Sequence, residues 1–268
     1  MNDFIKDFTK RLKNELKGGI KDRICYIHTH KCGGTSISSA IREHYIGLDM
    51  RTDQELISLD AESSAIASNY RKNSEKELYQ FREMLLTYFL GLKKTRFVSG
   101  HFLFNENVYK RFKKNYSFII VLRNPIERWI SHYFFNRYKK KKFGKIDIDL
   151  QECLASDFGL ENGREYIKFL GGFFENKIKN REAIEKAKSN LKFFDVIGFL
   201  EYKIDFIQKF NSRFGVKLNL MKKNENPKSE AFKKSLLTEE IKEKIAEVCI
   251  PDIALYNYAV ENFLQISK

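Results

Sequence analysis

The sequence predicts an α/β domain built on a central, mostly parallel sheet flanked by helices. Three observations predict it. Apolar stretches alternate with segments of helical periodicity, residues Phe118–Leu122 are entirely apolar, and the pair Gly33-Gly34 joins an apolar stretch to a helix-like segment. Unbroken apolar runs are typical of parallel strands covered on both faces, and helices connect such strands. The 268 residues form, we expect, one domain spanning residues 1–268.

The elements follow in order along the chain. Strands are expected at residues 24–29, 95–104, 116–125 and 193–201. Helices are expected at residues 36–45, 75–92, 125–142, 203–215, 238–249 and 252–264, with Pro125 suiting a first turn and Gly215 a helix end. Three segments complete the chain: an N-terminal helical extension at 1–22, a loop with a short helix at 50–75, and a helical insert at 144–192.

The charge and cysteine content limit the classes of function that the chain could have. There are 49 basic and 35 acidic residues, a net charge of +14, which favours polyanionic partners, although dispersed lysines also give a merely solvated surface. The four cysteines form no CxxC pair, which argues against a zinc site or disulfide framework and fits reduced thiols in the cytoplasm. No secretory h-region and no membrane-spanning segment is expected. The N-terminal helix packs on the domain or lies on a membrane surface.

The first motif is a glycine turn between the first strand and its helix. Residues 28–36 read HTHKCGGTS. Gly33 and Gly34 let the backbone approach an anion, the helix N-terminus that follows favours phosphate, and Lys31 adds a full positive charge. The pattern is not a Walker A loop, because the lysine precedes the glycines. A plain strand-to-helix turn is the alternative.

Two further motifs follow other strands. In VLRNPIERWISHY, Arg123 stands at a strand end and Ser131 lies about two turns into the next helix. Arginine and a hydroxyl there could clamp a second phosphate, unless Arg123 only pairs with Glu127. In VSGHFLF, His101 follows Gly100 at another strand end. A neutral histidine there could accept a proton from a hydroxyl, or it could be an ordinary core or surface histidine.

Together these motifs resemble the sulfotransferase family that uses 3′-phosphoadenosine 5′-phosphosulfate (PAPS). The branch they resemble contains the glycan O-sulfotransferases, such as heparan 2-O-sulfotransferase, and bacterial relatives. Residues 30–36 resemble its loop PK[TC]GG[TS]S, Gly100-His101 its Gly-His, and Arg123, Pro125, Arg128, Ser131 and Tyr133 its RxPxxRxxSxY. Weaker likeness in NGREYIKFLGG, VIGFLE and DIALYNYA extends the resemblance over residues 24–260.

The resemblance implies a P-loop-like nucleotide-hydrolase fold of three layers and a set of donor contacts. The 5′-phosphosulfate would be held by Lys31 and the turn residues Cys32, Gly33, Gly34, Thr35 and Ser36. Arg123 and Ser131 would hold the 3′-phosphate, and a later loop over the nucleotide would add Lys223 and Asn224. No metal is expected, because the family needs none and no carboxylate cluster for magnesium is evident.

The resemblance also implies the chemistry. His101 would act as general base while a sulfuryl group moves in line from PAPS to an acceptor hydroxyl, leaving 3′-phosphoadenosine 5′-phosphate (PAP). Lys31 would stabilise charge on the leaving oxygen. The acceptor would be a carbohydrate or glycan, an anionic one suiting the basic chain, near the insert at 144–192. His30 departs from the family pattern, replacing the proline before the lysine, and could compete with His101 as base.

Two other functions stay open at this stage. A small-molecule kinase would use a similar sheet, but a GK[ST] loop is absent from the sequence. A non-catalytic module binding nucleic acid or acidic glycan would rely on charge alone, with RYKKKKFGK at 137–145 as its best feature. That lysine run could also steer an anionic acceptor or be a solvated helix end. No specific nucleic-acid partner is expected.

Overall fold

The computed structural model describes residues 19–45, 56–69, 74–172, 180–220 and 230–265. Its centre is a five-stranded sheet in the order β2-β3-β1-β4-β5, with every neighbouring pair parallel. The strands are β1 (Arg23–Ile27), β2 (Leu56–Ser58), β3 (Phe97–Gly100), β4 (Tyr116–Leu122) and β5 (Val196–Phe199). All seven residues of β4 are buried, as its apolar sequence predicts. The predicted α/β class is confirmed.

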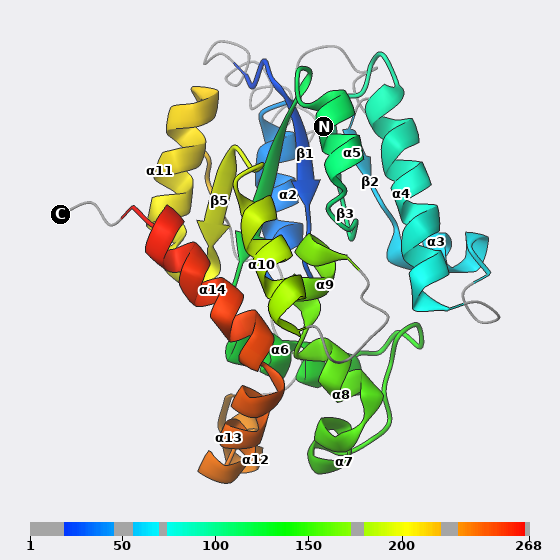
Figure 1. Ribbon diagram of the computed structural model, residues 1–268, viewed down its shortest axis with the longest axis vertical. Helices are drawn as coiled ribbons and strands as arrows, with labels where there is room; N and C mark the ends of the chain where they lie inside the picture. The colour runs from blue at the N-terminus through cyan, green and yellow to red at the C-terminus, as the bar shows by residue number, and fades with distance from the viewer. Residues whose placement is uncertain (1–18, 46–55, 70–73, 173–179, 221–229, 266–268) are drawn as a thin grey trace, which may run out of the picture.

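Helices cover both faces of the sheet (Figure 1). One face packs on α2 (Gly34–Glu43) and α11 (Lys203–Phe214) through a cluster that includes Ile24, Ile37, Ile119 and Phe210. A larger cluster on the opposite face joins the sheet to α4 (Glu75–Gly91), α5 (Glu106–Phe112), α9 (Glu165–Gly171), α10 (Asn180–Leu191) and α14 (Ile250–Phe263). The sheet is therefore the middle of three layers.

A third group of helices lies beyond the carboxyl ends of the strands (Figure 1). It comprises α6 (Pro125–Tyr138), α7 (Leu150–Ala155), α8 (Asp157–Asn162), α12 (Glu230–Leu236) and α13 (Glu239–Val248). A separate apolar cluster around Trp129, Phe134 and Ile245 holds this group together. Because all the strands run parallel, their carboxyl ends face these helices, and side chains that follow the strands contact α6 and α9 there.

The main departure from the sequence-based prediction is β2. Residues 50–75 were expected to be loop with a short helix, and α3 (Ala61–Ala67) is that helix, but Leu56–Ser58 also adds a strand beside β3. Three residues are too few to show an alternating pattern, so pairing with β3 rather than local sequence defines this strand. A short 3₁₀ turn (Leu200–Tyr202) follows β5. Within the described residues, none of the helices is both long and apolar enough to span a membrane.

Candidate active site

The loop between β1 and α2 favours glycine at two positions. Gly33 has φ of 74°, in the left-handed region, and a Cβ there would lie 2.9 Å from Leu200 Cδ1. A Cβ on Gly34 would lie 1.7 Å from His28 Nε2, so the imidazole packs directly on the glycine. Gly33 is the N-cap of α2 and offers no side-chain cap to the first-turn amides. The helix N-terminus therefore has donors and partial positive charge to offer an anion.

The turn between β4 and α6 is built differently. Asn124 caps α6, its side chain accepting from the amides of Ile126 and Glu127 at 3.1 and 3.2 Å. Arg123 precedes the cap, and its guanidinium donates to the Lys31 carbonyl and to Glu127 Oε2, both at 3.4 Å. The local pair with Glu127 does form, but Glu127 is largely exposed and the contact is long. Arg123 thus remains able to bind an anion beside the first loop.

Tyr166 of α9 connects the two turns. Its hydroxyl accepts from the Arg123 amide and donates to the Arg123 carbonyl, both at 2.7 Å, and lies 3.2 Å from Cys32 Sγ. Burial raises the pKa of the Tyr166 hydroxyl well above its ordinary value, and burial also raises that of the Cys32 thiol. Both groups are therefore neutral hydrogen-bonding partners. They hold the two turns at a fixed separation, and a ligand that bridges the turns needs such a separation.

Positive charge converges between the turns. Burial, followed by the charges of Arg123 and Lys139, lowers the pKa of Lys31 to about 8. The Lys31 ammonium lies 3.7 Å from the centre of the Phe135 ring, and Lys139 Nζ lies 5.4 Å from the same centre. Phe135 is 37% exposed on α6, so the lysines rest on an open aromatic face. Like charges gathered in a half-buried site favour the binding of an anion.

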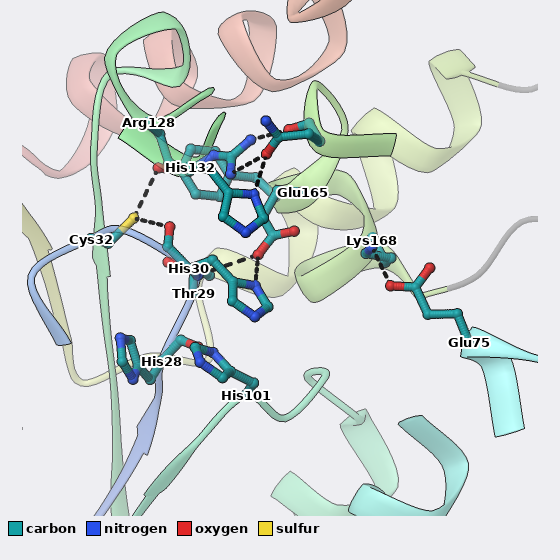
Figure 2. Close-up of polar contacts among 12 residues, drawn as sticks. His28, Thr29, His30, Cys32, Glu75, His101, Arg128, His132, Glu165 and Lys168 are labelled. Atoms are coloured by element: carbon teal, nitrogen blue, oxygen red, sulfur yellow. Dashed lines mark hydrogen bonds and ion pairs between the residues drawn. The ribbon is translucent and has the colours of Figure 1, made fainter. Parts of the chain in front are cut away.

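Three imidazoles stack beside this charged site, and we call His30, His101 and His132 the histidine stack (Figure 2). The ring centres of His30 and His101 are 3.8 Å apart with 17° between the planes, and those of His30 and His132 are 5.3 Å apart. His28 lies next to the stack, 4.6 Å from His101. Four of the five histidines of the chain therefore meet at the carboxyl ends of β1 and β3 and on α6.

Each ring of the stack has a different partner. His101 Nδ1 lies 2.6 Å from the His28 carbonyl, so Nδ1 carries the proton, leaving Nε2 as an acceptor. His132 Nδ1 lies 2.7 Å from Asn162 Oδ1. His30 Nδ1 contacts the Glu165 carboxylate, which also accepts from the His30 amide at 3.2 Å. Burial and the neighbouring His30 lower the pKa of His101 well below its usual range and that of His132 to about 3.

These groups line one cleft of about 2180 Å³ between the sheet and α6, α8 and α9. Of the site residues predicted from the sequence, the cleft is lined by Lys31, Gly33, Gly34, Thr35, Ser36, His101, Arg123 and Ser131. Cys32 is fully buried behind the loop, where it contacts Tyr166. It therefore supports the loop through its side chain, and only its backbone could bind a ligand. Lys223 and Asn224 lie outside the described residues.

Several residues that line the cleft or lie directly behind it were not singled out from the sequence. Glu165, Tyr166, His132 and Phe135 all contact predicted site residues. His132 and Phe135 follow Ser131 on the same helix, so the position of Ser131 could have indicated them. Glu165 and Tyr166 begin α9, inside the insert expected at 144–192, and residue spacing alone gives no signal of their partners. Among the described residues, no group of three or more candidate ligands has the arrangement of a metal site.

The chain is similar in structure to distant solved proteins. No protein-family model and no curated protein sequence matches the chain. The crystal structure of a sulfotransferase from Alicyclobacillus acidocaldarius aligns over 90% of this chain and 97% of its own, with 15% identity and a TM-score of 0.45. Its name is that of the family which the sequence motifs resemble. At this degree of similarity we base the functional assignment on the side chains of the cleft alone.

Proposed function

We propose that the protein is a sulfotransferase that moves a sulfuryl group from PAPS to a hydroxyl group of a carbohydrate or glycan. One observation carries the proposal. Lys31 and Arg123 converge from two neighbouring strand ends, beside a helix N-terminus without a side-chain cap and beside partly buried imidazoles. The cations and the helix suit a donor with two separate phosphate groups. The imidazoles suit an acceptor that loses a proton.

The donor fits the residues that are present. Lys31 and the start of α2, with Gly33, Gly34, Thr35 and Ser36, would hold the 5′-phosphosulfate, since the amides there and the lysine favour an anion. Arg123 and Ser131, which both line the cleft, would hold the 3′-phosphate. Lys223 and Asn224 stay proposed contacts to the nucleotide. No metal is assigned to the donor.

The reaction is an in-line displacement at sulfur. The acceptor oxygen forms a bond to sulfur while the bond from sulfur to the bridging 5′-phosphate oxygen breaks, and that oxygen keeps the electron pair. Lys31 and the α2 amides would stabilise the charge that develops there. The acceptor proton passes to an imidazole of the histidine stack, and His101, the base predicted from the sequence, offers a free Nε2. The products are PAP and the sulfated acceptor.

The acceptor would bind beside the histidine stack, where Tyr79, Arg82 and Lys168 line the cleft. Both cations are nearly buried, and Lys168 Nζ lies 2.8 Å from Glu75 Oε1. Aromatic faces, cations and carboxylates are groups that bind a hydroxyl-rich, anionic glycan by packing and hydrogen bonds. The four cysteines are buried and unpaired, as expected for a protein of the reducing cytoplasm, where we place it.

Transfer of labelled sulfur tests the proposal. The protein is incubated with [³⁵S]PAPS and a panel of neutral and carboxylated polysaccharides, without added metal, and both PAP release and label in the acceptor are measured. We expect acceptor-dependent release of PAP, with Arg123→Ala strongly reducing it and Arg181→Ala, a change at an exposed arginine of α10, leaving it unchanged. Phosphorylation of an acceptor by ATP and magnesium, with no sulfur transfer, would overturn the proposal in favour of a kinase.

A further inference from the structure

The histidine stack contains one imidazole that is built as a proton acceptor. Among the imidazoles of the stack, all of which the structure describes, only His30 has a carboxylate on its Nδ1. A carboxylate in this position fixes the tautomer with the proton on Nδ1, leaves Nε2 free to accept a proton, and stabilises the imidazolium that results. His30 lines the cleft, so its ring lies where an acceptor hydroxyl would bind.

The carboxylate itself is buried and charged. Glu165 is 3% exposed, and burial would raise its pKa, but contact with His30 and the charges of Lys168 and Arg128 hold that pKa well below the usual range. Arg128 is fully buried and donates to Asn162 Oδ1, which also contacts His132 Nδ1. A buried carboxylate is costly and is kept where cations and hydrogen bonds compensate it. The Glu165 carboxylate contacts both the ring Nδ1 and the backbone amide of His30.

His101 has a weaker arrangement for the same task. Its Nδ1 faces the His28 carbonyl, a neutral dipole, and its other close neighbours are the imidazoles of His28 and His30. Among the described residues, no carboxylate is in contact with the His101 ring to compensate a proton that arrives there. On His30 the same proton would be compensated by Glu165. The contacts therefore distinguish two rings that lie only 3.8 Å apart.

We infer that His30, held by Glu165, is the catalytic base of the proposed sulfuryl transfer, and that Glu165 is its positioning residue. The inference rests on the proposed function and gives His101 a supporting role as the ring stacked on His30. As the acceptor oxygen bonds to the sulfur of PAPS, its proton moves to His30 Nε2, and the electron pair of the breaking bond stays on the 5′-phosphate of PAP. Solvent then takes the proton from His30.

Variants of the two rings give the first test. His30→Asn keeps a donor toward Glu165 but removes Nε2, so we expect kcat to fall by about 10²- to 10⁴-fold. His101→Asn should lower kcat by less than about tenfold. His44→Asn, which changes the one histidine outside the cleft lining, is the control. Calorimetric titration with PAP should show that every variant keeps its donor site.

Glu165→Gln gives the second test, because it removes the charge and keeps the shape. We expect kcat to fall about ten- to a hundredfold and the acid limb of the pH–rate profile to move to lower pH, since the imidazolium loses its counter-ion. The substitution leaves the other titratable and charged groups around His30 unchanged. They are His28, His101, His132 and Lys31, with Arg128 and Lys168 beyond the carboxylate. Glu240→Gln, at an exposed ion pair of α13, should leave rate and profile unchanged.

The outcomes separate the inference from the proposed function. If the wild type transfers sulfur but His30→Asn keeps more than a tenth of its kcat, the inference is wrong and the function stands. A profile with the same acid limb in Glu165→Gln and wild type removes Glu165 from its role. If kcat falls more than a hundredfold in both His30→Asn and His101→Asn, a shift of the acid limb in Glu165→Gln identifies His30 as the base. A wild type that transfers no sulfur overturns the proposed function, and the inference with it.

Discussion

The two strand-to-helix turns of the cleft occupy equivalent places and are built in opposite ways. After β1, the chain turns through Gly33 into a helix that no N-cap side chain covers. After β4, it turns through Asn124 and Pro125 into a helix whose first amides are already bonded to the Asn124 side chain. The first turn offers backbone amides as well as Lys31. The second offers only the guanidinium of Arg123 and the hydroxyl of Ser131.

If the proposed donor binds here, this difference would let the site distinguish the two phosphates of PAPS. A turn that binds through backbone amides accepts any suitably placed anion. It would therefore bind every nucleotide that carries a 5′-phosphate and would not discriminate among them. A turn whose helix is capped by its own chain binds through side chains alone, so single substitutions can remove its ligand without altering the fold. We therefore expect changes at Lys31 to affect the reaction, and changes at Arg123 to affect which nucleotide is chosen.

The largest effect should come from Lys31. In Lys31→Met the stem can still pack on Phe135 but the charge is gone, so the leaving oxygen loses a stabilising group. We expect kcat to fall by about 10²- to 10³-fold, measured as PAP release at saturating PAPS. Lys114→Met, at an exposed lysine before β4, is the matched control. A variant with nearly full kcat and weak PAPS binding would mean that Lys31 only holds the donor.

Next comes the selectivity carried by Arg123. Arg123→Ala should weaken PAP binding by about ten- to a hundredfold, because a charged hydrogen bond contributes about 1.5–3 kcal/mol. Binding of ADP, which lacks the 3′-phosphate, should stay the same within about twofold. Calorimetry on both nucleotides measures the ratio. Equal losses for PAP and ADP would place Arg123 at the 5′ side and erase the distinction between the turns.

A smaller effect should follow pH. The pKa of Lys31 in the free protein is lowered to about 8 by burial, Arg123 and Lys139, and an anion binds best while this lysine is charged. The affinity for PAP should therefore be highest below pH 8 and fall by up to about tenfold per pH unit as pH rises through 8. Calorimetry at pH 7, 8 and 9 measures it, and Lys31→Met should lose the dependence. If the PAP affinity of Lys31→Met has the same pH dependence as that of the wild type, a group other than Lys31 causes it.

The smallest effect should come from the cap of the second turn. Asn124→Ala should cost about 1 kcal/mol of unfolding free energy, as for other lost caps, with PAP affinity unchanged. Asn105→Ala, which removes the matching cap of α5, should cost a similar amount. Chemical denaturation measures both. Tighter PAP binding by Asn124→Ala would show that the freed α6 amides can bind the anion, so that the two turns differ less than we propose.

The sequence indicated these turns because their residues are neighbours in the chain. Gly33-Gly34 after an apolar run, and Arg123 before Pro125 after another, are local patterns, and the parallel sheet brings strand ends to one edge. The contact of Glu165 with His30 joins residues 135 positions apart, and only the packing of α9 against the first loop creates it. Strand β2 was missed for a similar reason, because its partner β3 lies about forty residues away.

Thermal stabilisation by PAP, compared with ADP and AMP, tests the central claim most directly, because it needs no knowledge of the acceptor. A ligand that binds only the folded state stabilises it by about 2.7 kcal/mol at a hundred times its Kd. We predict a clear rise in Tm with PAP at concentrations where ADP and AMP give little or none, and loss of this preference in Arg123→Ala. Equal stabilisation by PAP and ADP, or a preference for ATP with magnesium, would contradict the assignment of a PAPS-dependent sulfotransferase.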